Sequence, residues 1–141
     1  MGTQQILLIV LGVIIIGAAM TVGLHLFIEQ TYSSNQQALA VEIQGFALRA
    51  VQWYKVPEAI GGAGLNPANL TVAHLASYLG FSGPNESTSS ENGSYRLVSV
   101  SGFTAQIEGT GLEIKRGRHP YILSTINLSN GSITAAISSV P

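Results

Sequence analysis

Hydrophobic residues fill the first part of the chain almost without interruption. From Ile6 to Ile28 the only clearly polar side chains are those of Thr21 and His25, and the first charged residue is Glu29. As a helix rising about 1.5 Å per residue, this segment is roughly 34 Å long, enough to cross the hydrocarbon core of a bilayer. The pattern therefore predicts a helix that is apolar on every side.

The next part of the chain keeps the helical period but becomes amphipathic. Apolar residues recur at spacings of three and four, while polar residues fall largely on the other face. The apolar positions are Leu39, Ile43, Phe46, Ala47, Ala50, Val51 and Tyr54, and the polar positions are Gln36, Glu42, Gln44, Arg49 and Gln52. Pro57 is the first proline, and a glycine-rich stretch follows it. We therefore predict a single helix from about Thr3 to Lys55.

A short helix and several strands are predicted beyond the long helix. Thr71 is an N-cap residue type, and Gly80 is a typical stop, so residues 72–79 read as a helix. Residues 82–94 are polar and read as a surface loop. Segments 95–101, 103–108, 121–128 and 133–138 read as strands, and segment 112–114 can extend one of them. Asn130-Gly131, between the last two strands, favours a type I′ hairpin turn.

These elements together predict an α+β fold. A sheet of three or four antiparallel strands, packed on the amphipathic part of the long helix, would bury two apolar surfaces that are not stable alone. The prediction is thus a long N-terminal α-helix, with an apolar half and an amphipathic half, packed against a small antiparallel β-sheet. Residues 1–29 form the hydrophobic helix. Residues 30–141 form a globular domain from the rest of that helix, the short helix and the sheet.

Composition and charge exclude several function classes. The chain is 46% hydrophobic and 9% charged, with a formal net charge of −1, so we expect no nucleic-acid partner. It has no cysteine, which removes disulfides and thiolate chemistry. It also has no aspartate and none of the common catalytic or metal-binding motifs. We expect no enzyme activity, no catalytic or metal site and no cofactor.

Five N-x-S/T sequons indicate the compartment. They lie at Asn69, Asn85, Asn92, Asn127 and Asn130, all C-terminal to the hydrophobic segment. Such a distribution favours an exported domain that can carry N-linked glycans. We expect glycan on at least one of the last four, because these lie in the predicted polar loop or beside the hairpin turn.

A secretory signal peptide is an alternative interpretation of the hydrophobic segment. Signal peptides have a basic n-region and a shorter apolar core. Here the first basic residue is Arg49, and the apolar run is longer. We therefore expect the segment to be retained in the mature protein.

The architecture resembles that of the type IV pilins. The resemblance is most specific in residues 1–28 and looser in residues 35–64. Several short segments of this chain are similar to segments of small bacterial pilin-like proteins, whose N-termini read much like Met-Gly-Thr-Gln-Gln. The similar segments are Ser34-Asn35-Gln36, Ala47-Leu48-Arg49-Ala50, Trp53-Tyr54, Pro57 and Gly61-Gly62.

This resemblance implies a structural subunit of an extracellular type IV pilus-like filament, or fimbrium. The hydrophobic helix would sit in the inner or cytoplasmic membrane before assembly and in the filament core afterwards. The implied partners are further copies of the chain, the membrane and the pilus assembly machinery, with an adhesive or glycosylated surface outside. Two alternatives stay open: a monomeric single-pass membrane protein displaying a β-rich binding domain, and a minor pseudopilin of a secretion system.

The chain departs from the pilin pattern at its N-terminus. Bacterial type IV pilins have a glutamate where this chain has Gln5, and most have a helix proline near Val22. The loop disulfide of many pilins and a basic leader ending in glycine are also missing from the sequence. A buried, unpaired amine is costly. We therefore predict that Thr3, Gln4 or Gln5 of an adjacent subunit reaches the Met1 amine or the free N–H groups of the first helical turn.

Two further sets of residues are candidates for contacts between subunits. The filament-core packing residues would be Ile6, Leu7, Val10, Gly12, Gly17, Ala19 and Gly23, whose small members permit close helix approach. The same glycines are also common in ordinary transmembrane helices. His25 and Glu29 lie one turn apart and can form a polar clasp between helices, or His25 can simply lie at a boundary with its tip in water.

The basic cluster Lys115-Arg116-Gly117-Arg118-His119 is the only one in the chain. It reads as a loop that is either simply solvated or in contact with an acidic surface, a nucleic acid or a neighbouring subunit's glutamate.

Overall fold

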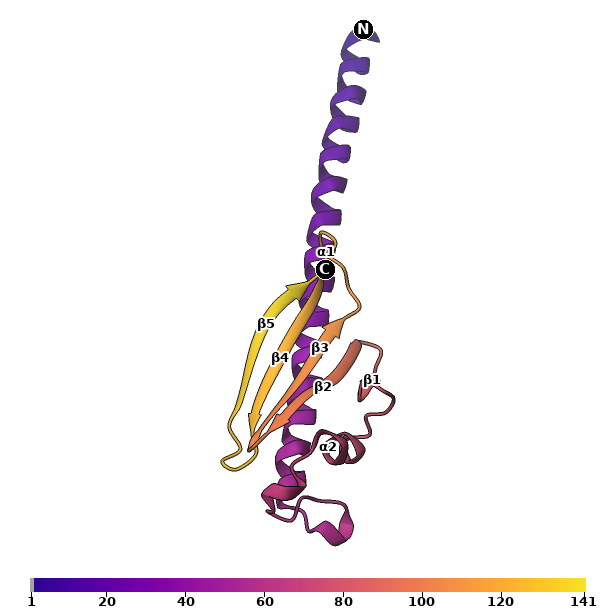
Figure 1. Cartoon of the computed structure of the whole chain (residues 1–141). Coiled ribbons are helices and arrows are strands. Elements are labelled where there is room, and N and C mark those ends of the chain that lie inside the picture. The colour runs from indigo at the N-terminus through magenta and orange to yellow at the C-terminus, as the bar shows by residue number, and fades with distance from the viewer. Residues whose placement is uncertain (1) are drawn as a thin grey trace.

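A computed structural model describes residues 2–141. Its longest element is α1, a helix of 54 residues from Gly2 to Lys55, about 80 Å long. The N-terminal half of α1 projects as an isolated rod, and the C-terminal half carries all the other elements, which we call the head (Figure 1). The prediction of one continuous helix is confirmed, and α1 passes residue 29 without a break.

A tight loop closes the C-terminal end of α1. The carbonyl groups of Trp53, Tyr54 and Val56 accept hydrogen bonds from the backbone N–H groups of Ala63, Leu65 and Gly64, at 2.8–3.0 Å. These bonds satisfy carbonyl groups that have no partner within the helix. The loop contains two 3-10 turns, η1 (Glu58–Ile60) and η2 (Pro67–Asn69).

The short helix α2 (Val72–Leu79) has the caps that its sequence predicts. The Thr71 hydroxyl accepts a hydrogen bond from the His74 N–H at 3.4 Å. Gly80 adopts the left-handed conformation, with φ 80°, and its N–H donates to the last turn. Leu75, Ala76 and Leu79 are buried in the head core.

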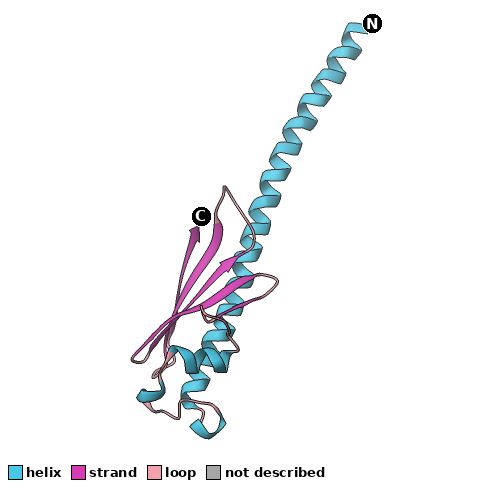
Figure 2. Cartoon of the chain, turned by 45° about the vertical axis from the view of Figure 1, so that its right-hand side comes forward, coloured by secondary structure: helices cyan, strands magenta, loops and turns pink. Residues whose placement is uncertain are grey.

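Five antiparallel strands follow in the order β1-β2-β3-β4-β5. Their bounds are β1 Ser87–Ser89, β2 Gly93–Ser101, β3 Thr104–Gly111, β4 His119–Asn127 and β5 Ile133–Val140. Burial alternates along β3 and β4, because one face of the sheet packs on α1 and the other faces outward (Figure 2). The α+β fold, a long apolar N-terminal helix packed against an antiparallel sheet, is thus confirmed.

Glycines in β3 let the helix approach the sheet closely. A Cβ atom on Gly109 would lie 2.6 Å from Ile43 Cδ1, and one on Gly111 would lie 2.1 Å from Asn35 Oδ1. At these distances the neighbouring side chain would have to move, so glycine at these positions lets the helix and the sheet pack this closely. The core between helix and sheet then contains Leu39, Trp53 and Ile107, all fully buried.

Three details of the predicted sheet are wrong. The polar loop contains a short strand, β1, which pairs with β2, so the sheet has five strands. Residues 112–114 form no strand. The turn at Asn130-Gly131 is not of type I′, because only Gly131 has a positive φ and the Gly131 N–H donates to the Asn127 carbonyl at 2.8 Å. The Asn127 side-chain oxygen stabilises this wider loop by accepting hydrogen bonds from the backbone N–H groups of Ser129 and Asn130.

Candidate assembly surface

The apolar half of α1 has no cover within the chain. Its large apolar side chains, from Ile6 to Ile28, are 43–69% exposed. Its most apolar stretch has a mean hydropathy of 2.8, and none of that stretch is buried. By length and composition, α1 is able to cross a membrane, although a signal sequence near an N-terminus has the same pattern. An apolar surface this large requires another molecule to cover it.

The predicted packing residues fall on two sides of α1. At about 100° per residue, Gly12, Ala19 and Gly23 lie within roughly 40° of one another. Gly17 lies on the other side of the helix, in the stripe formed with Ile6, Leu7 and Val10. A Cβ atom added to Gly12, Gly17 or Gly23 would meet nothing within 4 Å. Nothing in the described chain therefore requires these glycines, each of which costs about 1 kcal/mol relative to alanine in a helix.

Exposed apolar residues continue along α1 beside the head. Val41 is 70% exposed and Leu48 is 57% exposed. By the same helical geometry they lie on roughly the same side as Gly12, Ala19 and Gly23. The sequence analysis missed both residues, because it looked for apolar residues at helical spacing on one face of α1. Val41 and Leu48 are apolar residues outside that face.

An apolar groove lies between α1 and the edge strand β5. It has a volume of about 320 Å³ and is lined by residues of α1, β4 and β5, including Leu48, Ser124 and Ile137. Ile137 is 60% exposed, although its side chain lies on the helix-facing side of the sheet, opposite the buried Ile122. The Ser124 hydroxyl at the groove is buried and has no hydrogen-bond partner among the described residues. The groove extends the uncovered apolar surface of α1 onto the head.

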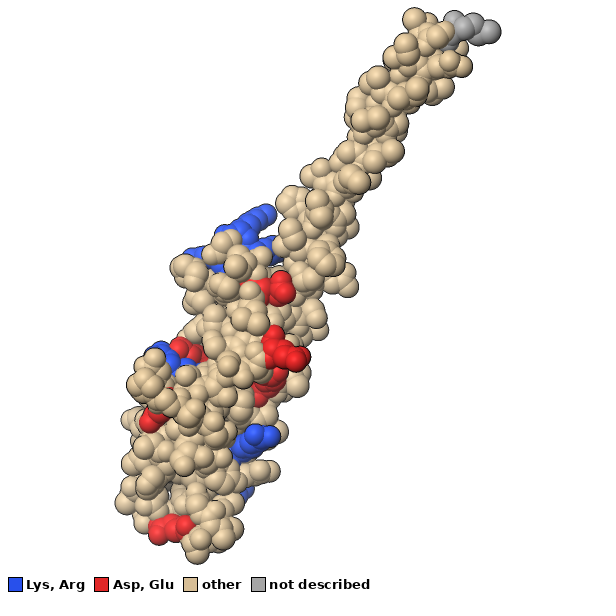
Figure 3. Space-filling view, turned by 90° about the vertical axis from the view of Figure 1, so that its right-hand side faces the viewer, with Lys and Arg blue, Asp and Glu red and all other residues tan. Residues whose placement is uncertain are grey.

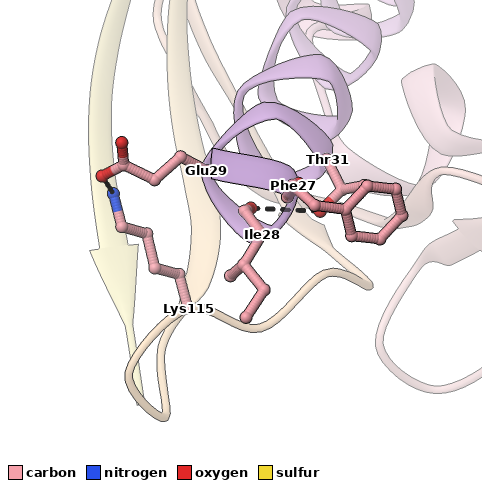
Figure 4. Close-up of polar contacts among 5 residues, drawn as sticks. All are labelled: Phe27, Ile28, Glu29, Thr31 and Lys115. Carbon is pink, nitrogen blue, oxygen red and sulfur yellow. Dashed lines mark hydrogen bonds and ion pairs between the residues drawn. The ribbon is translucent and has the colours of Figure 1, made fainter. Parts of the chain in front are cut away.

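Glu29 forms an ion pair with Lys115 in residues 115–118, the turn between β3 and β4 that we call the basic hairpin. Lys115 Nζ lies 2.7 Å from Glu29 Oε1, and Figure 4 shows the two side chains pointing toward each other. No hydrogen bond joins His25 to Glu29 among the described residues, and the predicted clasp of His25 and Glu29 between helices stays a prediction. Lys115 was predicted to lie in a loop, and its ion pair with Glu29 was not predicted.

The Thr21 and Thr31 hydroxyls donate hydrogen bonds to carbonyl groups of the preceding turn of α1, at 3.0–3.1 Å.

The N-terminal polar residues are exposed on the first turns of α1. Thr3, Gln4 and Gln5 are helical, and their side chains make no hydrogen bond within residues 2–141. Met1 lies outside the described residues, so the predicted contact with its amine stays a prediction. These side chains are available to another copy of the chain.

The five sequons differ in how accessible their amide nitrogen is. The Asn69 Nδ2 donates to the Glu58 carboxylate and to the Ala63 carbonyl, and the Asn92 Nδ2 donates to the Glu42 carboxylate. Asn85 and Asn130 are exposed. Asn127 uses its side-chain oxygen in the β4–β5 loop. Since N-linked glycan attaches to Nδ2, Asn85 and Asn130 are the more accessible acceptors.

A polar cluster joins α1 to the turn between β1 and β2. The Glu42 carboxylate accepts hydrogen bonds from Ser90 Oγ, at 2.7 Å, and from Asn92 Nδ2. Burial raises the pKa of Glu42, but the nearby Tyr95 hydroxyl and these hydrogen bonds outweigh it, so that pKa lies below its ordinary value. Burial is the larger cause that raises the pKa of Tyr95, and the Glu42 carboxylate is the next. The Tyr95 hydroxyl is buried without a well-formed hydrogen bond.

The fold and this surface define a class: an α+β protein whose largest apolar surface is left for another molecule to cover. In comparisons with family models, curated proteins and solved structures, none matched the chain. Its function is therefore inferred from its own residues.

Proposed function

We propose that the chain is a structural subunit of an extracellular, type IV pilus-like filament. It would polymerise through the apolar half of α1, with the head on the filament surface. The observation that supports this most directly is the rod itself: residues 6–28 are the most apolar part of the chain, and none of them is buried. Other copies of the same helix are the simplest cover for such a rod.

A membrane stage before assembly would keep the rod out of water. Removing this rod from water contributes on the order of tens of kcal/mol at about 25 cal/mol per Å². The subunit would therefore sit in the inner or cytoplasmic membrane until it is moved into the filament. Since lipid already covers apolar surface, assembly depends on helix packing, polar contacts and an assembly machinery. The close-approach stripe of Gly12, Ala19 and Gly23 fits that requirement.

Exposed apolar residues beside the head favour the filament over a monomeric membrane anchor. Along α1, Val41 lies about 20 Å and Leu48 about 30 Å beyond Ile28. A bilayer that covers residues 6–28 leaves both in water. A second copy of the chain, packed along α1 and into the groove beside β5, covers the rod, these two residues and Ile137 together.

Microscopy of material sheared from the cells that produce the chain tests this proposal. We expect thin filaments that contain the chain. In the double variant Val41→Gln/Leu48→Gln we expect few filaments, while Ile60→Gln, which changes a residue that is 72% exposed on the η1 turn, should assemble normally. A chain that is released only by detergent, with no filaments, would support the single-pass anchor. A filament of another protein containing only traces of the chain would support the minor pseudopilin.

A further inference from the structure

The basic hairpin lies where the apolar rod ends. Its tip is a two-residue turn: the Lys115 N–H donates to the Arg118 carbonyl at 2.9 Å, and the Arg118 N–H donates back at 3.1 Å. Arg116 and Gly117 both have positive φ, 54° and 74°, as a type I′ turn requires. The ion pair between Lys115 and Glu29 holds the tip beside the first residue after the apolar segment. Figure 3 shows one group of basic side chains at the end of the head from which the rod emerges, and others further along the head.

This position is the level of lipid headgroups in a membrane-anchored subunit. The apolar segment is roughly 34 Å long, against about 30 Å for the hydrocarbon core of a bilayer. Glu29 and the hairpin tip therefore reach the headgroup layer. The nearest other acidic residue on this connection is Glu113, whose backbone N–H lies 3.4 Å from Asn35 Oδ1. Asn35 is about 9 Å further along α1, away from the membrane.

The three cations at the hairpin tip differ in the partners that their side chains have within the chain. Lys115 is paired with Glu29, and the Arg118 guanidinium reaches only the Ser139 hydroxyl, at 3.5 Å. Arg116 is exposed and makes no hydrogen bond or ion pair within residues 2–141. Two apolar side chains of the same connection, Leu112 and Ile114, are 59% and 56% exposed. Exposed cations next to exposed aliphatic side chains are typical of segments that lie in a membrane interface.

We propose that this hairpin binds anionic phospholipid headgroups while the subunit is anchored in the membrane, which rests on the membrane stage of the proposed function. Arg116 and Arg118 bind the phosphates, and Ile114 contacts the adjoining acyl region. The contact sets the tilt of the head against the bilayer and is lost when the subunit enters the filament. A guanidinium is suited to phosphate because its planar set of donors matches two phosphate oxygens.

Nuclear magnetic resonance of the full chain in lipid nanodiscs tests the proposal. A gadolinium chelate on the headgroup of a trace lipid relaxes nearby amide protons, and the amides of Gly117 and Gly131 report the two ends of the sheet. We expect stronger relaxation at Gly117 than at Gly131 in both lipids, because the rod places the hairpin at headgroup level. The relaxation at Gly117 should be stronger in discs with one-third phosphatidylglycerol than in pure phosphatidylcholine, because the headgroup contact tilts the head toward the bilayer. Each cation near an anionic surface should change the ratio of bound to released hairpin about fivefold.

Matched variants separate charge recognition from simple proximity. Arg116→Asn keeps a residue that tolerates positive φ, and combined with Arg118→Gln it should reduce the anionic-disc signal at Gly117 to the phosphatidylcholine level. Arg49→Gln removes one exposed cation about 30 Å further along α1 and should leave the signal unchanged. Equal relaxation in both lipids, or in the double variant and the unchanged chain, would overturn the proposal.

A separate readout distinguishes failure of this proposal from failure of the membrane stage. The Gly17 amide should be relaxed by a spin label in the acyl chains and protected from a water-soluble gadolinium chelate. An unprotected Gly17 overturns the membrane stage and the headgroup contact together. A protected Gly17, with no dependence of Gly117 on lipid charge, overturns the headgroup contact alone. If the double variant behaves normally in discs but forms few filaments, the hairpin binds a neighbouring subunit instead.

Discussion

The two halves of α1 share one backbone but differ in what their side chains contact. In residues 2–28 no side chain is buried, whereas the second half buries Leu39, Ile43, Ala47, Ala50, Trp53 and Tyr54. Around the second half, glycines in the opposing strand β3 let the helix and the sheet pack closely, while the glycines of the first half face open space. The buried face of the second half is thus explained by the fold of a single chain, whereas the exposed Val41 and Leu48 on its other side are not. The first half is explained only by contacts with other molecules.

Gly23→Leu should give the largest effect, because it changes only the contacts with other molecules. The added side chain has room in the isolated chain, so the head should unfold at an unchanged denaturant concentration in detergent. Between helices packed at small residues, a leucine prevents close approach, so filament yield should fall to near zero. Gly23→Ala is the control and should assemble. Normal filaments from Gly23→Leu would contradict the close-packing interpretation.

A pair of identical substitutions on the same helix tests the contrast in folding energy. Leu39 is fully buried and Leu26 is 61% exposed. Leu39→Ala should lower the free energy of unfolding of the head by about 2–5 kcal/mol, since it leaves a cavity. Leu26→Ala should change that free energy by less than about 0.5 kcal/mol. Denaturant unfolding in detergent, followed by the fluorescence of Trp53, measures both, and equal effects would mean that the two halves are not energetically separate.

Acid should loosen the head and leave the rod unchanged. The pKa of Glu42 is lower in the folded chain than its ordinary value of 4.5, so its contribution to stability is complete above about pH 4.5 and is lost as pH falls through the lowered pKa. We expect the free energy of unfolding of the head to fall as the pH drops below about 4.5, because protonation removes the charge that these hydrogen bonds stabilise. Glu42→Gln should show a smaller pH dependence than the unchanged chain, and Glu113→Gln serves as the exposed control. A Glu42→Gln profile that parallels the unchanged chain would remove this carboxylate from the account.

Substitutions at the accessible sequons should have the smallest effect on stability. Asn85→Gln changes an exposed side chain, so the free energy of unfolding should change by less than about 0.5 kcal/mol. The same change should remove the mass of one glycan if Asn85 is the acceptor, and Asn130→Gln tests the second site in the same way. Asn92→Gln is the comparison, because the Asn92 amide is bound to Glu42 and we expect no glycan there. An intact mass equal to that of the bare polypeptide would remove the evidence from glycans for export.

Prediction from the sequence succeeded where the pattern is local. The caps of α2 were predicted because Thr71 and Gly80 act within one turn of the helix that they end. The strand β1 was missed because three polar residues, Ser87–Ser89, become a strand only by pairing with β2. The type I′ turn was assigned to Asn130-Gly131 but occurs at Arg116-Gly117, where antiparallel pairing on both sides imposes positive φ on an arginine.

The candidate assembly surface also has parts that the sequence predicted and parts that it did not. The apolar rod was predicted from the sequence, because continuous hydrophobicity and a helical period need no knowledge of the fold, and the packing role of its small residues stays a prediction. Exposure of Val41, Leu48 and Ile137 was not predicted, since it depends on which side of α1 the sheet covers. The glycan acceptors could be named from a three-residue motif, but their ranking needed the hydrogen bonds that occupy Asn69 and Asn92.

By itself, then, the sequence determined one long helix, its change from apolar to amphipathic near residue 29, and the α+β class, because these follow from periodicity and local backbone preference. Only the tertiary structure decided that Glu29 pairs with Lys115, 86 positions along the chain, and that the basic hairpin lies beside the end of the rod. Contacts between residues so far apart depend on how the sheet packs across the helix. No local pattern contains that information.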